Sequence, residues 1–438
     1  MALHYACRSS LIFALCSALL CGCGSSSTSG MPSQMPSGGS AGAPASAGAG
    51  AGGASTGGAG GAGVAGSPNA GAAGSSGGAS GGVGGTAAGG AGSGGAASSG
   101  APFVFVGGTG QISIFKLDAA LGKLTLVKSV DGGDTPSFLA LDLSRTHLYA
   151  VNEGNAKVAS FSVDPKTGDL TLLNRVDSGG DAPAFVTVDR SGKYLLVANY
   201  TGGTARVFPI AADGSLGPPS DNEAPGKNSH MILTDPANHF AFVPNLGSNT
   251  VSQYAFDAST GKLTANGVPT VMTAAGAGPR HLAFHPNGKV VYLIAELDDT
   301  LTAYSYDATL GQLSLLQPPQ STLPAGANGA ANSCAEVVVA PSGNFVYGSN
   351  RGHDSIVTFS VDATGKLTFV GTTPCGGNVP RSFTLSADGK LMLVANESGN
   401  VTSFSVDVAT GKLTKLLSID VPAKPQFVGI VNLPGASP

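Results

Sequence analysis

The feature that most constrains this chain is a turn motif that recurs seven times between residues 121 and 413. Each copy is a short polar turn that ends in Gly, followed by one residue and then Leu. Successive copies lie 46, 46, 47, 50, 54 and 46 residues apart, with the glycines at Gly122, Gly168, Gly214, Gly261, Gly311, Gly365 and Gly411. A period near 47 residues, filled with short apolar runs, is typical of β-propeller blades of about four strands. The repeat therefore predicts an all-β, seven-bladed β-propeller.

The third repeat shows the predicted strand order of one blade. An inner strand at residues 185–188 precedes a turn, and a near-continuous apolar strand follows at 194–198. A third strand at 205–210 leads to the Gly-x-Leu turn and then to a polar outer strand. The apolar second strand fits a position buried on both faces between neighbouring blades. The period-two alternation excludes a helical solenoid.

The two ends of the repeat region predict how the ring closes. Residues 103–106 come first in this region and have the apolar pattern of the second strand of a blade. Residues 427–431 come last and have the pattern of an inner strand. We expect the last strand to pair with the first, because closure removes strand edges that would otherwise promote aggregation. The propeller is predicted to occupy residues 102–438.

A long uncharged segment precedes the repeats. Residues 24–100 contain 29 of the 67 glycines, most other positions are Ala or Ser, and no charged side chain lies between Arg8 and Lys116. Such a segment cannot bury enough apolar surface to offset the entropy of ordering it. We therefore predict a disordered Gly/Ala/Ser tether over residues 23–101, which includes the Cys at its start.

The N-terminus resembles an export signal. Residues 11–20 form an apolar run of ten, which is too short to span a membrane and suits the core of a signal peptide. The run ends in Leu20-Cys21-Gly22-Cys23, which resembles a bacterial lipobox. We expect a signal peptide over residues 1–22, lipidation at Cys23 and an outer-membrane lipoprotein outside the cytoplasm. An ordinary signal peptide cleaved nearby is the alternative.

Composition limits the partners and cofactors. The formal net charge is −4, which argues against nucleic-acid binding. Cysteine and histidine spacings typical of metal sites are absent from the sequence, so no cofactor is predicted and EDTA should not affect activity. Two cysteines remain in the repeat region, Cys334 and Cys375, and they either pair in an oxidising compartment or stay as buried thiols. Because propellers are self-contained, we expect a monomer.

The few charged residues follow the predicted hairpins. In an antiparallel hairpin, residues equidistant from the turn are neighbours, which pairs Arg280 with Glu296 across Gly288 and pairs Arg381 with Glu397 in the same way. Glu336 and Arg351 flank a third such turn to within a residue or two, and His230 opens the inner strand of the preceding blade. The residues predicted to converge on one face are His230, Arg280, His281, Glu296, Glu336, Arg351, Arg381 and Glu397.

These residue types suit acid recognition and proton transfer. Arginines bind carboxylate or phosphate with a forked geometry and can stabilise a developing oxyanion. A Glu or His held by an Arg can act as a general base. The alternative is structural, since Arg–Glu pairs at this position also serve as ion pairs between blades.

Several motifs resemble the seven-bladed β-propeller lactonase family, of the 6-phosphogluconolactonase-like, cycloisomerase 2 type. The resemblance covers residues 103–432. The motifs, in chain order, are YLLVANY at 194–200, VPNLG at 243–247, GPRHLAFHPNG at 278–288, YLIAEL at 292–297, SNRGHDSI at 349–356 and PRSF at 380–383.

The resemblance implies roles for individual residues. The family includes lactone hydrolases and a fungal branch that lactonises a carboxymuconate, where a His, two Arg and a Glu line the site. By motif and order these resemble His230, Arg280, Glu296 and Arg351 here. The arginines would bind the acid group and polarise the lactone carbonyl, while Glu296 or His230 handles the proton. Substrate-binding roles are expected for His281, Glu336, Arg381 and Glu397.

The chain departs from the family at three positions near this set. Phe185 and Asn228 stand where relatives often carry His, and Asn245 replaces an Asp. We expect an exported, membrane-anchored lactone hydrolase that opens a sugar-type or acid-bearing lactone, its partner being a small lactone or organic acid. The alternatives are a non-catalytic surface propeller used for binding and a muconate-type lactonising enzyme. Because 6-phosphogluconolactone is cytoplasmic, an exported protein is expected to meet other lactones.

Overall fold

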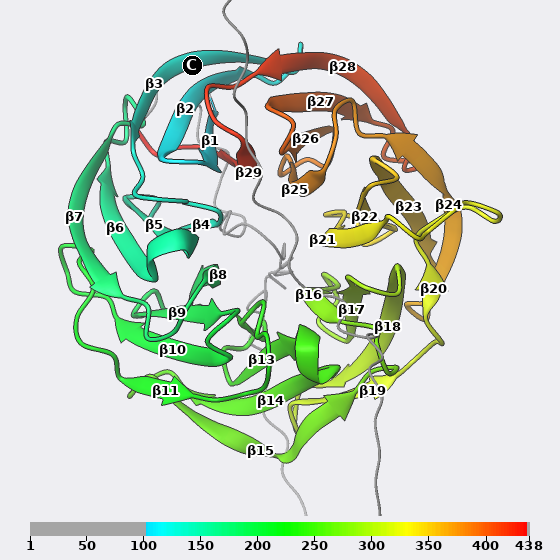
Figure 1. Cartoon of the computed structure of the whole chain (residues 1–438), viewed down its shortest axis with the longest axis horizontal. Helices are drawn as coiled ribbons and strands as arrows, with labels where there is room; N and C mark the ends of the chain where they lie inside the picture. The colour runs from blue at the N-terminus through cyan, green and yellow to red at the C-terminus, as the bar shows by residue number, and fades with distance from the viewer. Residues whose placement is uncertain (1–101, 436–438) are drawn as a thin grey trace, which may run out of the picture. The chain divides into compact units, whose positions relative to one another are not determined.

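The computed structural model describes residues 102–435, which form seven antiparallel sheets arranged as blades around a central axis (Figure 1). Blade 1 contains β29, β1, β2 and β3, and blades 2 to 7 follow in chain order. This arrangement confirms the predicted all-β, seven-bladed propeller. The predicted signal peptide, Cys23 and the tether lie outside the described residues.

Each blade runs from an inner to an outer strand. The inner strands, from blade 1 to blade 7, are β29 (Pro425–Val431), β4 (Leu139–Leu141), β8 (Pro183–Val188), β12 (Leu233–Thr234), β16 (Pro279–Phe284), β21 (Ser333–Val339) and β25 (Pro380–Leu385). The second strands are β1 (Phe103–Gly108), β5 (His147–Asn152), β9 (Tyr194–Asn199), β13 (Phe240–Asn245), β17 (Val290–Ala295), β22 (Phe345–Arg351) and β26 (Leu391–Asn396).

The third and outer strands complete the sheets. The third strands are β2 (Gln111–Asp118), β6 (Lys157–Val163), β10 (Thr204–Pro209), β14 (Thr250–Asp257), β18 (Thr300–Asp307), β23 (Ser355–Val361) and β27 (Asn400–Val406). The outer strands are β3 (Lys123–Asp131), β7 (Leu170–Asp177), β11 (Asp221–Glu223), β15 (Lys262–Met272), β19 (Gln312–Leu315), β24 (Leu367–Pro374) and β28 (Leu413–Asp420), and β20 (Gln320–Ser321) also pairs with β18. Two 3₁₀ turns, η1 (Glu153–Asn155) and η2 (Leu246–Ser248), follow second strands.

The ring closes through pairing of the two chain ends of the propeller. β29 pairs antiparallel with β1, and the register places Val431 opposite Phe103 and Val428 opposite Val106. Blade 1 is therefore built from the last strand and the first three strands of the chain. This confirms the predicted closure.

The Gly-x-Leu turns form the seams between neighbouring blades. All seven glycines have positive φ, and all seven leucines are buried. At Gly214 in blade 3, an added Cβ would lie 2.0 Å from the His147 side chain of blade 2, and the Tyr149 hydroxyl donates to the Gly214 carbonyl at 3.2 Å. Only glycine satisfies both the left-handed backbone and the close approach. The repeated motif therefore specifies how each blade seats against the one before it.

Both cysteines of the propeller are buried free thiols. Cys334 lies at the start of β21 and Cys375 follows β24. Of the two alternatives left open by the sequence, the structure has the unpaired one. No helix in residues 102–435 is long and apolar enough to cross a membrane.

Candidate active site

The candidate site lies at the end of the propeller where the inner strands begin. In every blade the second strand ends beside the start of the inner strand. Two successive residues of the inner strand line the central cavity in several blades, as Arg280 and His281 do in blade 5 and Arg381 and Ser382 do in blade 7. The cavity is lined by Ser137, Phe138, Ala184, His230, Arg280, His281, Glu336, Arg381, Ser382 and Gln426.

β-Bulges explain why neighbouring residues share the cavity. In blade 5 the register shifts between Pro279 and His281, so Arg280 is an extra residue in the inner strand. In blade 7 the same shift occurs between Pro380 and Ser382, at Arg381. A bulge interrupts the strict alternation of side chains and redirects one of them. The bulges thus let a two-residue segment contribute both side chains to the same cavity.

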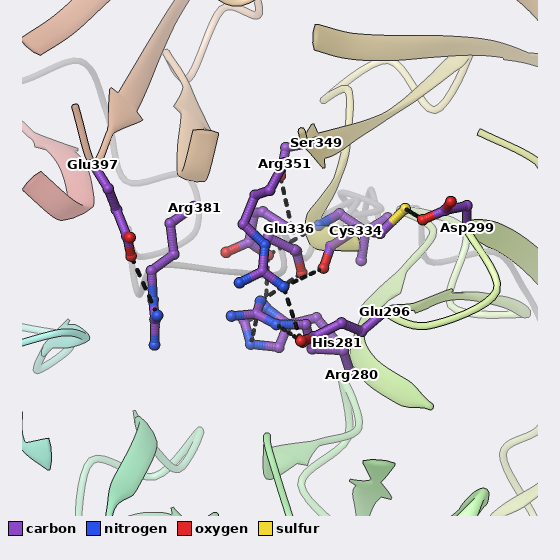
Figure 2. Close-up of polar contacts among 12 residues, drawn as sticks. Arg280, His281, Glu296, Asp299, Cys334, Glu336, Ser349, Arg351, Arg381 and Glu397 are labelled. Carbon is purple, nitrogen blue, oxygen red and sulfur yellow. Dashed lines mark hydrogen bonds and ion pairs between the residues drawn. The ribbon is translucent and has the colours of Figure 1, made fainter. Parts of the chain in front are cut away.

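The first charged cluster consists of Arg280, Glu296 and Arg351, and we call it the arginine-rich triad (Figure 2). Arg280 Nε lies 2.8 Å from Glu296 Oε2, and Arg351 Nη2 lies 3.0 Å from Glu296 Oε1. The arginines also donate to backbone carbonyls, Arg280 to Ala335 at 2.6 Å and Arg351 to Cys334 at 2.9 Å. One carboxylate therefore bridges two guanidinium groups from adjacent blades.

The protonation states of the arginine-rich triad follow from this geometry. Burial alone would raise the pKa of Glu296, but the charges of Arg280 and Arg351 outweigh it and hold the pKa below its ordinary value. Burial, followed by the charge of Arg351, lowers the pKa of Arg280 to about 10. Counted by formal charge, two arginines and one glutamate leave the triad with one net positive charge.

His281 and Glu336 form an almost fully buried pair beside Arg280. His281 Nδ1 donates to Glu336 Oε1 at 2.9 Å, and the Val337 amide donates to the same oxygen at 3.0 Å. Burial lowers the pKa of His281 more than Glu336 raises it, so the ring is neutral at neutral pH. Its Nε2 then accepts from Arg280 Nη1, 3.4 Å away. The pair therefore orients Arg280 through the His281 ring.

The placement of Glu336 corrects one expectation. The hairpin rule places Glu336 and Arg351 as near neighbours, but β21 is bulged between Cys334 and Val337, and Arg351 pairs in register with Ser333. The Glu336 side chain contacts His281 of the adjacent blade, and Arg351 contacts Glu296. Glu336 lies three residues along β21 from Ser333, which is enough to send the two side chains to different partners.

His230 completes the cavity wall beside the arginine-rich triad. Its ring packs edge-on against His281 at 5.0 Å and against Tyr200 at 5.4 Å between ring centroids. Burial, followed by the charge of Arg280, places the pKa of His230 well below its ordinary value. Its Nδ1 has no hydrogen-bond partner among the described residues. The ring is therefore neutral, and it has an unengaged nitrogen.

The second charged cluster consists of Glu153, Arg381 and Glu397, and we call it the glutamate-rich triad. Arg381 Nη1 lies 3.3 Å from Glu397 Oε1 and Arg381 Nη2 lies 3.2 Å from Glu153 Oε2. Gln426 also donates to Glu397 at 3.4 Å. Glu153 belongs to blade 2 and Arg381 to blade 7, so this ion pair joins two blades that are separated in the ring by blade 1. Here two carboxylates share one guanidinium group.

Sequence reasoning predicted the Arg381–Glu397 contact but missed Glu153, Ser137, Gln426 and Tyr200. A signal for Glu153 and Tyr200 was present. Each directly follows the buried Asn that ends a second strand, the same position that Arg351 and Glu397 occupy in blades 6 and 7. Aligning the repeats on that Asn would have identified both residues.

The three departures from the family pattern have structural roles. Phe185 packs against Phe138 at 4.2 Å and lies edge-on to His281 at 5.3 Å between ring centroids, next to the cavity. Asn228 has a left-handed backbone with φ of 57° and donates to Tyr200 O at 3.4 Å. Asn245 is fully buried and accepts from the Ser229 hydroxyl at 2.8 Å. Within residues 102–435, no three His, Cys, Asp or Glu side chains come together as a metal-binding group.

Comparison with known proteins identifies the class. Residues 97–428 match the family model described as "Lactonase, 7-bladed beta-propeller", and the chain therefore belongs to this family. It is 35% identical over 331 residues to the 6-phosphogluconolactonase of Bacillus subtilis, which covers 72% of this chain and 93% of that protein. It is 33% identical over 330 residues to the 6-phosphogluconolactonase of Formosa agariphila, which covers 70% of this chain and 92% of that protein.

Solved structures agree with the family assignment. A putative 6-phosphogluconolactonase from Bacteroides fragilis superposes with a TM-score of 0.70 at 29% identity, covering 77% of this chain and 100% of that one. The periplasmic gluconolactonase of Pseudomonas aeruginosa superposes with a TM-score of 0.71 at 29% identity, covering 76% of this chain and 99% of that one. The predicted family is thereby confirmed, and the expectation of a lactonase-type enzyme agrees with it.

Proposed function

We propose that the protein is an exported, membrane-anchored lactone hydrolase that opens a sugar-type or acid-bearing lactone. The observation that carries this proposal is that Arg280 of the arginine-rich triad lines one cavity together with a neutral His230. Export and anchoring rest on the N-terminal sequence, including Cys23, and a periplasmic gluconolactonase among the structural neighbours supports a location outside the cytoplasm.

The arginines would stabilise the charge that develops on the lactone carbonyl. Water attack turns this oxygen into an oxyanion, and fixed donors aimed at it lower the barrier most effectively where water is excluded. Arg280 is almost fully buried, and Arg351 Nε is a buried donor with no acceptor among the described residues. Both are already oriented by Glu296, so little reorganisation is needed when the charge forms.

His230 is the better proposed base of the two candidates from the sequence. Both carboxylate oxygens of Glu296 are engaged by arginines, so neither is free to accept a proton from water. His230 is neutral and has an unengaged nitrogen. The nearby arginines oppose its protonation, and the developing oxyanion compensates that charge.

The proposed reaction balances without a cofactor. The water oxygen bonds to the carbonyl carbon while its proton passes to His230. The ring C–O bond then breaks, and His230 returns the proton to the departing alkoxide. The product is a hydroxy acid, whose carboxylate matches the net positive charge of the arginine-rich triad.

A panel of aldonolactones tests this proposal. The protein should accelerate ring opening of at least one member above the spontaneous rate, and Arg280→Ala should remove the acceleration. Asp131→Asn, which removes a carboxylate from an exposed ion pair on β3, is the matched control and should retain wild-type activity. Failure to open any member while an organic acid still binds would favour the non-catalytic binding propeller.

A further inference from the structure

We propose that the glutamate-rich triad, with Ser137 and Gln426, is a subsite for the hydroxyl groups of a neutral aldonolactone and that it disfavours a phosphate ester. This inference rests on the proposed lactone-hydrolase function and names the substrate class for it. The arginine-rich triad would hold the reacting carbonyl, and the glutamate-rich triad would hold the rest of the sugar.

One arginine of each triad lines the central cavity, and the two triads carry opposite formal net charge. Arg280 and Arg381 both line that cavity. Two arginines and one glutamate give the first triad a net charge of +1, while one arginine and two glutamates give the second −1. A ligand that contacts both arginines therefore meets a guanidinium group that shares one carboxylate with Arg351 at the first triad, and a guanidinium group held by two carboxylates at the second.

Unpaired buried polar groups point to a ligand at the second triad. Ser137 lines the cavity at 2% exposure, and its hydroxyl has no hydrogen-bond partner among the described residues. Gln426 Oε1 is likewise without a partner there, although its amide nitrogen donates to Glu397. A buried polar group without a partner costs free energy. Sugar hydroxyls would satisfy both groups.

The chemistry of the second triad discriminates between hydroxyl and phosphate. Hydroxyl groups donate to carboxylates and accept from guanidinium, so they can bond to Glu153, Arg381 and Glu397 alike. A phosphate dianion offers only acceptors, and both glutamates would repel it. The single guanidinium is already shared by two carboxylates at 3.2 and 3.3 Å. Like charges that face each other disfavour binding and produce specificity by exclusion.

Substrate discrimination in the intact protein tests the inference. We would measure kcat/KM for an aldono-δ-lactone and for its terminal phosphate ester, with spontaneous opening subtracted. The neutral lactone should be preferred by at least about tenfold. The double variant Glu153→Gln with Glu397→Gln should reduce this preference by about fivefold or more, chiefly by faster opening of the phosphate ester. Asp131→Asn should leave the preference unchanged.

A second variant separates hydrogen bonding from charge. Ser137→Ala should raise KM for the neutral lactone by about three- to tenfold at nearly constant kcat, since it removes one binding contact. If the double variant is unstable in thermal unfolding, the two single glutamine variants replace it, and each should shift the preference in the same direction.

The outcomes separate this inference from the proposed function. The subsite is refuted if both lactones open equally well. It is also refuted if the phosphate ester opens faster and the glutamine variants leave the ratio of the two rates unchanged. In both cases the proposed lactone-hydrolase function is retained. If neither lactone opens, the proposed function fails. Calorimetric binding of the aldonate and its phosphate ester then decides the charge preference, and tighter binding of the phosphate ester overturns the subsite.

Discussion

The two triads of the central face are built from the same residue types in inverted proportion. The arginine-rich triad places two guanidinium groups around Glu296, whereas the glutamate-rich triad places two carboxylates around Arg381. The two triads also differ in their most buried arginine, since the Arg280 side chain is 2% exposed and that of Arg381 is 18% exposed, while Arg351 at 15% is similar to Arg381. The first is therefore suited to stabilising charge out of water, and the second to binding polar groups at a wetter position.

Burial changes what each triad costs and what it can do. A guanidinium as buried as Arg280 loses its hydration, so its ion pair with Glu296 at 2.8 Å and its bond to the Ala335 carbonyl offset a large desolvation penalty. Arg381 keeps part of its hydration, and its ion pairs are weaker and screened by solvent. Arg280 should therefore be more sensitive to substitution than Arg381.

Removal of one arginine from each triad gives the largest expected difference. Arg351 and Arg381 have similar exposed fractions, 15% and 18%, and are a matched pair. Arg351→Ala should lower kcat for an aldonolactone by about 10²- to 10³-fold, as expected for loss of an oxyanion donor. Arg381→Ala should act chiefly on KM. Steady-state kinetics check this, and an equal effect of both variants on kcat would erase the distinction between the triads.

Removal of one glutamate from each triad should separate their contributions to stability. Glu296→Gln leaves two arginines without their shared partner and should lower the free energy of unfolding by about 3–5 kcal/mol. Glu397→Gln should cost no more than about 1 kcal/mol, because Arg381 keeps Glu153 and solvent. Denaturant unfolding measures both. Similar losses would show that burial does not distinguish the two triads.

The pH dependence of activity tests the protonation state beside the arginine-rich triad. A pKa of His230 well below its ordinary value keeps the ring neutral as the pH falls from 7 to 5.5. The base form is thus retained, and kcat/KM should stay nearly constant over this range. A base with an ordinary pKa near 6.5 would lose about eightfold. A drop of that size, absent from His230→Gln, would show that the arginines do not depress this pKa.

Salt should give the smallest difference. The glutamate-rich triad is partly exposed, so added salt screens its repulsion of a phosphate ester. The preference for the neutral lactone should fall by about two- to threefold between low and high ionic strength. Turnover of the neutral lactone itself should change little. If the preference for the neutral lactone does not change with salt, it arises from the shape of the cavity and not from charge.

Local patterns predicted much of this molecule, because they are expressed within single hairpins. The Gly-x-Leu turns give the blade count, the end strands predict closure, and hairpin symmetry predicts Arg280 beside Glu296. These features depend on residues close in sequence or on a repeat period. Such predictions tolerate a β-bulge, because the bulge at Arg280 shifts the strand register by only one residue.

Contacts between blades could not be predicted in this way. Glu153 and Arg381 are 228 positions apart in the sequence. Their contact depends on the closure of the ring and on the reach of the two side chains. The partner of Glu336 depends on a bulge that has no signature in the apolar pattern. Pairing of Cys334 with Cys375 likewise depends on tertiary distance, which the spacing of 41 residues does not determine.

The central claim is that the arginine-rich triad is the reacting end of a lactone-hydrolysing cavity. The most direct test is kcat/KM of wild-type protein and of Arg280→Ala on unphosphorylated aldonolactones, with spontaneous opening subtracted and folding checked by thermal unfolding. The account predicts clear turnover by the wild type and none above background for the folded variant. Wild-type turnover retained by Arg280→Ala would contradict it.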